Sequence, residues 1–198
     1  MVPRSGSTNH IGYTINQHQQ TLISPAICKF GYMSFFAVFL KSKCMKPNTY
    51  TKLYAHCIFT PNGRQSLLTD SLRPLVHKYI YGTIHGMKCN PIGINGTKDH
   101  IHLLIGFNPS TCIADFIRDI KRSSAIYVNS YHLSPYKFSW QEGYGAFTVG
   151  YRQLDSVYKY ILDQEAHHAK HHFRIEYEEI LLDEGCEYDE NFKFEFYD

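Results

Sequence analysis

MKCNPIGINGTKDHIHLLIGF, residues 87–107, is the stretch that decides the fold. It contains two runs with strand composition, Met87–Ile94 and Asp99–Phe107. They are joined through Asn95-Gly96, the dipeptide that best tolerates the positive φ angles of a tight turn. The stretch therefore predicts an antiparallel hairpin. Because Pro91 has no N–H to donate, the first strand is expected at an edge of the sheet.

The segments on either side of this hairpin alternate between strands and helices. Thr51–Thr60 has strand composition, and the apolar spacing from Leu72 to Gly86 predicts a helix. A second helix is predicted over residues 110–129, a last strand over Gly145–Tyr151 and a third helix over Asp155–Lys170. The order β-α-β-β-α-β-α predicts an α+β fold, with an antiparallel sheet of about four strands and helices on one face.

Two histidines mark the second strand of the hairpin. His100 and His102 are two residues apart, so their side chains leave the same face of the strand and could share one ion. His-x-His is a weak signal by itself. A half-buried strand that happens to show two histidines is the alternative interpretation.

The third predicted helix adds a polar stripe. At about 100° per residue, Tyr160, Gln164, His167 and His171 fall on one side, opposite an apolar stripe. A phenol one turn away from an amide oxygen would lie beside a metal ion bound by oxygen ligands. A solvated helix face that carries a stray tyrosine is the alternative.

This combination of residue types suits the chemistry of phosphodiesters. A divalent ion can neutralise the phosphate oxygens, orient the phosphate and stabilise the leaving oxygen. A tyrosine nucleophile conserves the bond as an ester that a later 3′-hydroxyl can attack, which hydrolysis would waste. Breaking and rejoining strands without ATP needs such an intermediate.

Charge is unevenly distributed along the chain. The net charge is +2, but residues 173–198 carry ten acidic residues against Arg174 and Lys193, which leaves +10 on residues 1–172. A basic body suits a polyanionic partner, and a solvated acidic terminus is the alternative reading. We expect three segments: a poorly ordered N-terminal extension over 1–44, a domain over 45–172 and an acidic C-terminal tail over 173–198.

The expected environment is the cytoplasm, without a membrane partner. The six cysteines lie far apart and form no C-x-x-C pair, which favours a reducing compartment. The apolar run from Met33 to Leu40 is too short to span a bilayer.

The chain from about Asn48 to Glu179 resembles a known family in five ordered strings. These strings are TYTKLY (49–54), NGTKDHIHLL (95–104), DIKRSS (119–124), FSWQEGYGAF (138–147) and YILDQEAHH (160–168). They resemble the single-tyrosine HUH transposases of the smallest bacterial insertion sequences, the IS-two-hundred/six-hundred-and-five type, and the related REP-associated tyrosine transposases. The resemblance implies a ferredoxin-like HUH fold.

The resemblance also implies roles for residues that match the family motifs. His100 and His102 would be metal ligands, Gln164 the third protein ligand to Mg²⁺ or Mn²⁺, and Tyr160 the nucleophile that forms a 5′-phosphotyrosine. The family acts on single-stranded DNA at hairpin-marked element ends. It works as a homodimer whose active sites can be completed between subunits. The expected location is the bacterial cytoplasm, in association with the nucleoid.

Five basic residues are candidates for contacts to DNA phosphates, although a solvated helix face is the alternative for each of them. They are Arg118, Lys121, Arg122, Arg152 and Lys159.

Two other functions compete with transposition. One is a domesticated protein that binds hairpin DNA without moving it. The other is a metal-dependent nuclease in which Tyr160 is structural, so that cleavage leaves no covalent adduct.

Overall fold

The computed structural model describes residues 50–187, 189 and 194–197, so the extension predicted over 1–44 lies outside the described residues. Its centre is a four-stranded antiparallel sheet in the order β2-β3-β1-β4. The strands are β1 (Tyr54–Phe59), β2 (Asn90–Gly96), β3 (Ile101–Gly106) and β4 (Gly145–Thr148). The predicted α+β fold and its antiparallel sheet are confirmed, and this strand order is that of a ferredoxin-like β-α-β-β-α-β unit.

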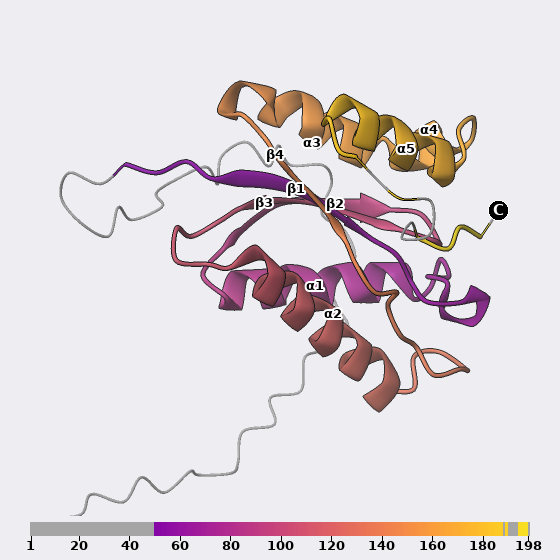
Figure 1. Cartoon of the computed structure of the whole chain (residues 1–198). Coiled ribbons are helices and arrows are strands. Elements are labelled where there is room, and N and C mark those ends of the chain that lie inside the picture. Colours follow the sequence, from indigo (N-terminus) through magenta and orange to yellow (C-terminus); the bar gives the residue numbers. More distant parts are fainter. Residues whose placement is uncertain (1–49, 188, 190–193, 198) are drawn as a thin grey trace, which may run out of the picture. The chain divides into compact units, whose positions relative to one another are not determined.

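The helices form two layers (Figure 1). Helices α1 (Arg73–Gly86) and α2 (Ile113–Ser130) lie on one face of the sheet, and α3, α4 and α5 lie on the other. The last three helices span Leu154–Leu162, Gln164–His168 and Phe173–Asp183. The expectation of helices on one face therefore holds for α1 and α2 only, because the central strands bury side chains on both of their faces.

The larger core lies between the sheet and helices α1 and α2. Cys57 and Phe59 of β1 and Ile101, Leu103 and Ile105 of β3 point to this side and are fully buried. They alternate with side chains that point to the opposite face, as the pleat of a strand requires. This core makes the sheet a rigid support for the other face.

The second layer is held by smaller apolar clusters. Leu104 of β3 packs with Leu154 and Ile161 of α3. Helix α5 packs through Phe173, Tyr177 and Leu181, one turn apart, together with Ile58 and Phe147 of the sheet. Residues 173–183, which the sequence analysis placed in an acidic tail, thus form a helix with an apolar side.

The link between β2 and β3 differs from the predicted turn. Asn95 and Gly96 are not at its tip but in β2, where they pair with His102 and Ile101. The link consists of residues 97–100 instead, because the Thr97 hydroxyl donates to Asp99 Oδ1 at 2.5 Å and stabilises a wider turn. The prediction that the strand containing Pro91 is an edge strand is correct.

The third predicted helix is interrupted at Asp163, between α3 and α4. The side-chain amide of Asn95 donates to the carbonyl of Leu162 at 2.9 Å. A side chain that captures a helix carbonyl bends the helix at that point. Tyr160 and Gln164 still face the same side, but His171 lies beyond the end of α4.

None of the helices that the structure describes combines the length and the apolar composition needed to cross a bilayer.

Gly96 provides a test of the hairpin geometry. Its φ is +156°, and a Cβ at this position would lie 2.2 Å from the carbonyl oxygen of His100. We expect Gly96→Ala to lower the free energy of unfolding by about 2 kcal/mol or more, because backbone atoms must move. Urea denaturation measures the effect.

The matched control is Gly82→Ala in helix α1, where a Cβ would meet nothing within 4 Å. It should raise the stability by about 0.5–1 kcal/mol, the usual gain of alanine over glycine in a helix. Equal stability of Gly96→Ala and the parent chain would show that the turn is not constrained in this way.

Candidate metal and nucleophile site

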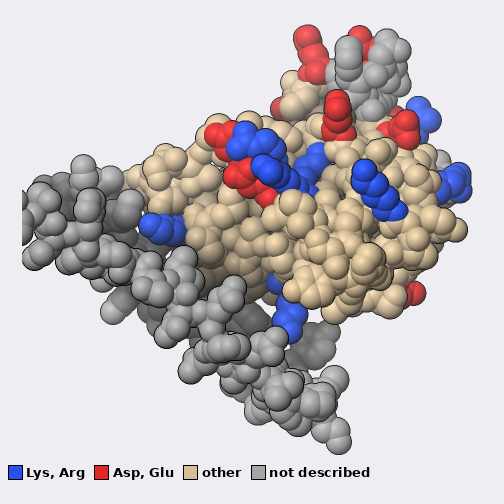
Figure 2. Space-filling model, turned by 90° about the horizontal axis from the view of Figure 1, so that it is seen from below, with Lys and Arg blue, Asp and Glu red and all other residues tan. Residues whose placement is uncertain are grey.

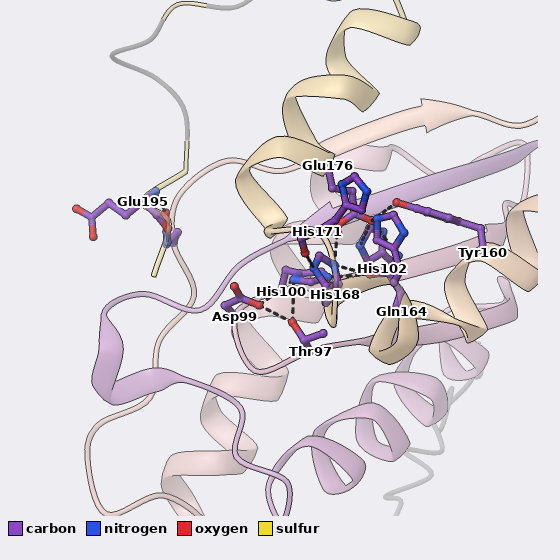
Figure 3. A network of polar contacts seen from close by, with 12 residues as sticks. Thr97, Asp99, His100, His102, Tyr160, Gln164, His168, His171, Glu176 and Glu195 are labelled. Carbon is purple, nitrogen blue, oxygen red and sulfur yellow. Dashed lines mark hydrogen bonds and ion pairs between the residues drawn. The ribbon is translucent and has the colours of Figure 1, made fainter. Parts of the chain in front are cut away.

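A buried polar cluster lies between the sheet and the helices α3, α4 and α5 (Figure 3). The 97–100 link and β3 supply two histidines, α3 supplies a tyrosine, α4 an amide and a histidine, and α5 a carboxylate. These residues are His100, His102, Tyr160, Gln164, His168 and Glu176. All except Tyr160 and His168 are at most 2% exposed.

His100 is oriented by the turn that precedes it. Its Nδ1 lies 2.9 Å from Asp99 Oδ1, and Thr97 Oγ1 lies 3.1 Å away. A carboxylate accepts a hydrogen bond, so the proton of the neutral ring belongs on Nδ1. The lone pair of Nε2 therefore faces the cluster.

His102 is oriented by a histidine on the neighbouring strand. Its Nδ1 lies 2.8 Å from Nε2 of His56 in β1, and the two rings are stacked. Its Nε2 is buried and has no hydrogen-bond partner among the described residues. An imidazole whose Nδ1 is hydrogen-bonded and whose Nε2 is bare is a typical metal ligand.

His168 repeats this arrangement from helix α4. Its Nδ1 lies 2.8 Å from the backbone carbonyl oxygen of His171, which can only accept a hydrogen bond. The proton of the neutral His168 ring is therefore on Nδ1, and Nε2 presents its lone pair to the cluster.

Gln164 presents an oxygen to these rings. Its Nε2 donates to Glu176 Oε1 at 2.9 Å, which fixes the orientation of the amide. Its Oε1 then lies 3.1 Å from His100 Nε2 and 2.9 Å from His168 Nε2. The amide oxygen and the two imidazole lone pairs are all acceptors, and no donor among the described residues lies between them. A cation bound at this point would interact favourably with all three.

Burial keeps His56, His102 and His168 neutral at physiological pH. It lowers the pKa of His102 well below the usual value and lowers the pKa values of His56 and His168 to about 4. For Asp99, burial acts to raise the pKa, but the hydrogen bond and the charge of His100, together with the hydrogen bond from Thr97, outweigh it and bring the pKa to about 2. His102 and His168 therefore offer neutral nitrogen lone pairs, the form that binds metals.

Glu176 is the carboxylate of the cluster. Its Oε1 accepts a hydrogen bond from the Tyr160 hydroxyl as well as from Gln164. Burial, followed by the charges of Asp99 and Glu179, raises its pKa to about 8. Such a group can exchange a proton near neutral pH.

The Tyr160 side chain connects this cluster to the surface. Its hydroxyl points inward to Glu176, and its ring is edge-on to His102 with centroids 5.9 Å apart. An open pocket of about 570 Å³ lies beside it. The pocket is lined by Tyr160, Asp163, Ala166, His167, Lys170 and His171. A phosphate could approach Tyr160 from this side.

The structure thus brings His100, His102, Tyr160 and Gln164 together, as the sequence suggested. It also adds three residues that the sequence analysis did not place in the site: His56, His168 and Glu176. His56 points to the same face of the sheet as His102, but only strand pairing shows this. His168 lies one helical turn after Gln164, which was an available signal, whereas nothing local marks Glu176.

The five basic candidates do not lie together. Three of them, Arg118, Lys121 and Arg122, are on α2, on the far side of the sheet from the cluster. Lys159 lies in α3, and Arg152 lies just before α3. On the face that carries α1 and α2, lysine and arginine side chains are scattered among acidic ones (Figure 2).

Two of the candidates on α2 are already engaged in the fold. Arg118 pairs with Asp115 at 2.5 Å and Asp119 at 3.2 Å. Lys121 donates to the carbonyls of Gln141 and Gly143 at 2.5 and 2.7 Å, and burial lowers its pKa to about 8.

Comparison with known proteins places these residues in context. A family model described as "Transposase IS200 like" matches residues 49–164. No curated protein matches the sequence.

The similar solved structures include two transposases. A protein from Deinococcus radiodurans, assigned as a transposase, has 22% sequence identity and a TM-score of 0.47, with 60% of this chain and 95% of that chain covered. A REP-associated tyrosine transposase bound to a REP hairpin has 13% identity and a TM-score of 0.47, with 62% of this chain and 73% of that chain covered.

His56 gives a test of how the cluster is oriented. The change His56→Phe keeps an aromatic ring but removes the hydrogen-bond partner of His102 Nδ1. We expect it to weaken Mn²⁺ binding about 10–100-fold. Calorimetric titration of the metal-free protein measures the affinity. His77→Phe in α1 is the control, because His77 lies on the other layer, and it should leave the affinity unchanged.

Proposed function

The chain belongs to the IS200-like transposase family, and from this premise we propose that it cuts and rejoins single-stranded DNA through a covalent bond between Tyr160 and a 5′ phosphate. One observation carries the proposal. The Tyr160 hydroxyl reaches the buried cluster of the same chain, where it donates to Glu176 beside His102.

We propose that His100, His102 and Gln164 hold a divalent ion, Mg²⁺ or Mn²⁺. Their donor atoms fit this role, because Nε2 of His102 is buried without a hydrogen bond and Gln164 Oε1 faces His100 Nε2 at 3.1 Å. When bound, such an ion would neutralise the phosphate oxygens and polarise the scissile phosphodiester.

Tyr160 makes the new bond. Its oxygen attacks the phosphorus, the bond between phosphorus and the 3′ oxygen breaks, and a 5′-phosphotyrosyl ester remains on the protein. The tyrosyl proton passes to Glu176 Oε1, which already accepts its hydrogen bond. The leaving 3′ oxygen takes up a proton from solvent water and departs as a hydroxyl, and Glu176 returns its proton to solvent. Attack by another 3′-hydroxyl reverses the sequence and rejoins a strand.

The DNA substrate is proposed from the family and from where the basic residues lie. We propose hairpin-marked single strands as the substrate, bound on the side of Tyr160. Arg152 and Lys159 are exposed on this side and suit phosphate contacts. For Arg118, Lys121 and Arg122, a contact requires that the DNA also reaches α2, and Arg122 is the most available of the three because the other two already bind acidic or carbonyl oxygens.

The homodimer expected from the resemblance stays a prediction. Within one chain, Tyr160 and Gln164 both hydrogen-bond to Glu176, and Gln164 contacts His100. We therefore propose that each chain carries its own complete site, whether or not two chains associate.

The nucleophile is tested by Tyr160→Phe. With Mn²⁺ and labelled single-stranded oligonucleotides from DNA that flanks the gene, the parent protein should form a labelled adduct that survives a denaturing gel. Tyr160→Phe should lose the adduct entirely, because phenylalanine has no oxygen to attack phosphorus. Tyr158→Phe, on the same helix and also half-buried, is the control and should keep it.

The alternatives predict other results in the same assay. Cleaved DNA from both the parent and Tyr160→Phe, without any adduct, would indicate a nuclease with a structural tyrosine. Hairpin binding without cleavage under any metal would indicate a DNA-binding protein that does not transpose DNA.

Mixing two inactive variants tests whether sites are shared. Tyr160→Phe keeps its metal ligands, and a chain with His100→Ala and His102→Ala keeps its nucleophile. If each chain uses its own site, the mixture should form no more adduct than either variant alone. Recovery of roughly a quarter or more of the parent's activity would instead show sites completed between subunits.

A further inference from the structure

Helix α5 supplies the site with a carboxylate that lies outside the residues matched by the family model. Glu176 lies beyond residues 49–164, as does His168 at the end of α4. Glu176 is 2% exposed and is surrounded by the rings and the amide of the cluster. Neither residue belongs to the ligand set proposed above, so their presence there needs its own explanation.

The donor atoms gather closely enough that small side-chain shifts would let them share one ion. One ligand atom from each of His100, His102, His168 and Glu176 lies within 4.8 Å of all the others. Glu176 Oε2 is 2.8 Å from His168 Nε2, and Glu176 Oε1 is 3.6 Å from His102 Nε2. Two ligands that are each about 2.1 Å from an ion lie about 3.0 Å apart at a right angle and about 3.4 Å apart at a tetrahedral angle.

The close pair formed by Glu176 and His168 is not explained by a hydrogen bond from the His168 ring. Glu176 Oε2 is buried and has no hydrogen-bond partner among the described residues, although His168 Nε2 is only 2.8 Å away. The His168 proton is directed away, to the carbonyl of His171. Two lone pairs that face each other at this distance repel, and either a proton on Glu176 or a cation shared by the two groups relieves that repulsion.

Charge balance allows the same two states, a proton or a bound cation. The ion-pair partners that the structure describes for Glu176 are all histidines. A carboxylate buried without a lysine or arginine is costly unless it is protonated or binds a cation.

We propose that Glu176 and His168 complete, with His100 and His102, a metal centre of three imidazoles and one carboxylate that binds Mn²⁺, Co²⁺ or Zn²⁺ in preference to Mg²⁺. The proposal rests on the proposed function in one respect only, that the same pocket holds a metal ion. Imidazole ligands favour these transition ions, whereas Mg²⁺ favours oxygen ligands and water. Gln164 Oε1 faces the same point and remains compatible with this set.

Metal titration of the full chain tests the proposal. The metal-free protein is titrated with Mn²⁺ and with Mg²⁺ by calorimetry, and with Co²⁺ by visible absorption, which reports the ligands directly. The parent chain should bind Mn²⁺ more tightly than Mg²⁺. Glu176→Gln and His168→Gln should each weaken Mn²⁺ binding more than about tenfold, which is the lower end of the effect even for residues that only orient a ligand. Both should also change the shape of the Co²⁺ spectrum.

The control is Asp183→Asn, which removes an exposed carboxylate from the last turn of the same helix. It should leave the affinities and the Co²⁺ spectrum unchanged. Thermal melting in the presence of a chelator establishes that each variant folds. The rise in melting temperature caused by Mn²⁺ should be smaller in Glu176→Gln than in Asp183→Asn.

Two results would overturn the proposal, and they differ in what else they overturn. If Glu176→Gln and His168→Gln bind Mn²⁺ within about twofold of the parent while His100→Asn does not, the two residues are not ligands and the family metal site stands. If His100→Asn also binds Mn²⁺ as tightly as the parent, the ion is bound outside this pocket. The metal part of the proposed function then fails too. The Tyr160→Phe adduct assay reports on the nucleophile independently of both.

Discussion

Side-chain alternation in the two central strands is the constraint on which the rest of this molecule depends. In β1 and β3, every second residue enters the apolar core under α1 and α2, and the residues between them point to the other layer. That layer receives both apolar side chains, such as Leu104, and polar ones, His56 and His102. Because the strands are held firmly from one side, the histidines on the other side have fixed positions.

Burial then dictates how the polar layer is built. A buried imidazole needs a partner for its N–H group, since an unpaired polar group costs about 1–3 kcal/mol. His102 finds that partner in His56, His100 in Asp99, and His168 in a backbone carbonyl. Each of these bonds is made by Nδ1, so all three rings turn Nε2 toward one point. The orientation of the candidate ligands thus follows from satisfying the other nitrogen of each ring.

A hydrogen bond between layers marks the end of the helix that carries the nucleophile. Asn95 lies in the edge strand β2 and donates to the carbonyl of Leu162, where α3 ends. Tyr160 and Gln164 lie on either side of the interruption at Asp163, and both face the cluster. The backbone leaves the cluster after α4. It then returns as α5, whose apolar side packs on the sheet and whose Glu176 enters the site. The nucleophile, the candidate ligands and the carboxylate are therefore linked by one network of contacts.

The sequence by itself determined the features that have a local period. It predicted the order of strands and helices, the edge position of the strand with Pro91, the shared face of His100 and His102 and the common stripe of Tyr160 and Gln164. It failed where distant residues decide the outcome: the helix layer on the second face, the turn at residues 97–100, the interruption at Asp163, and the entry of His56 and Glu176 into the site. These depend on contacts between segments far apart in the chain, such as Asn95 with Leu162 or Tyr160 with Glu176, which leave no repeating pattern in the sequence. Only the packing of α3, α4 and α5 on the sheet could show that an acidic stretch after the matched domain supplies a carboxylate to the buried cluster.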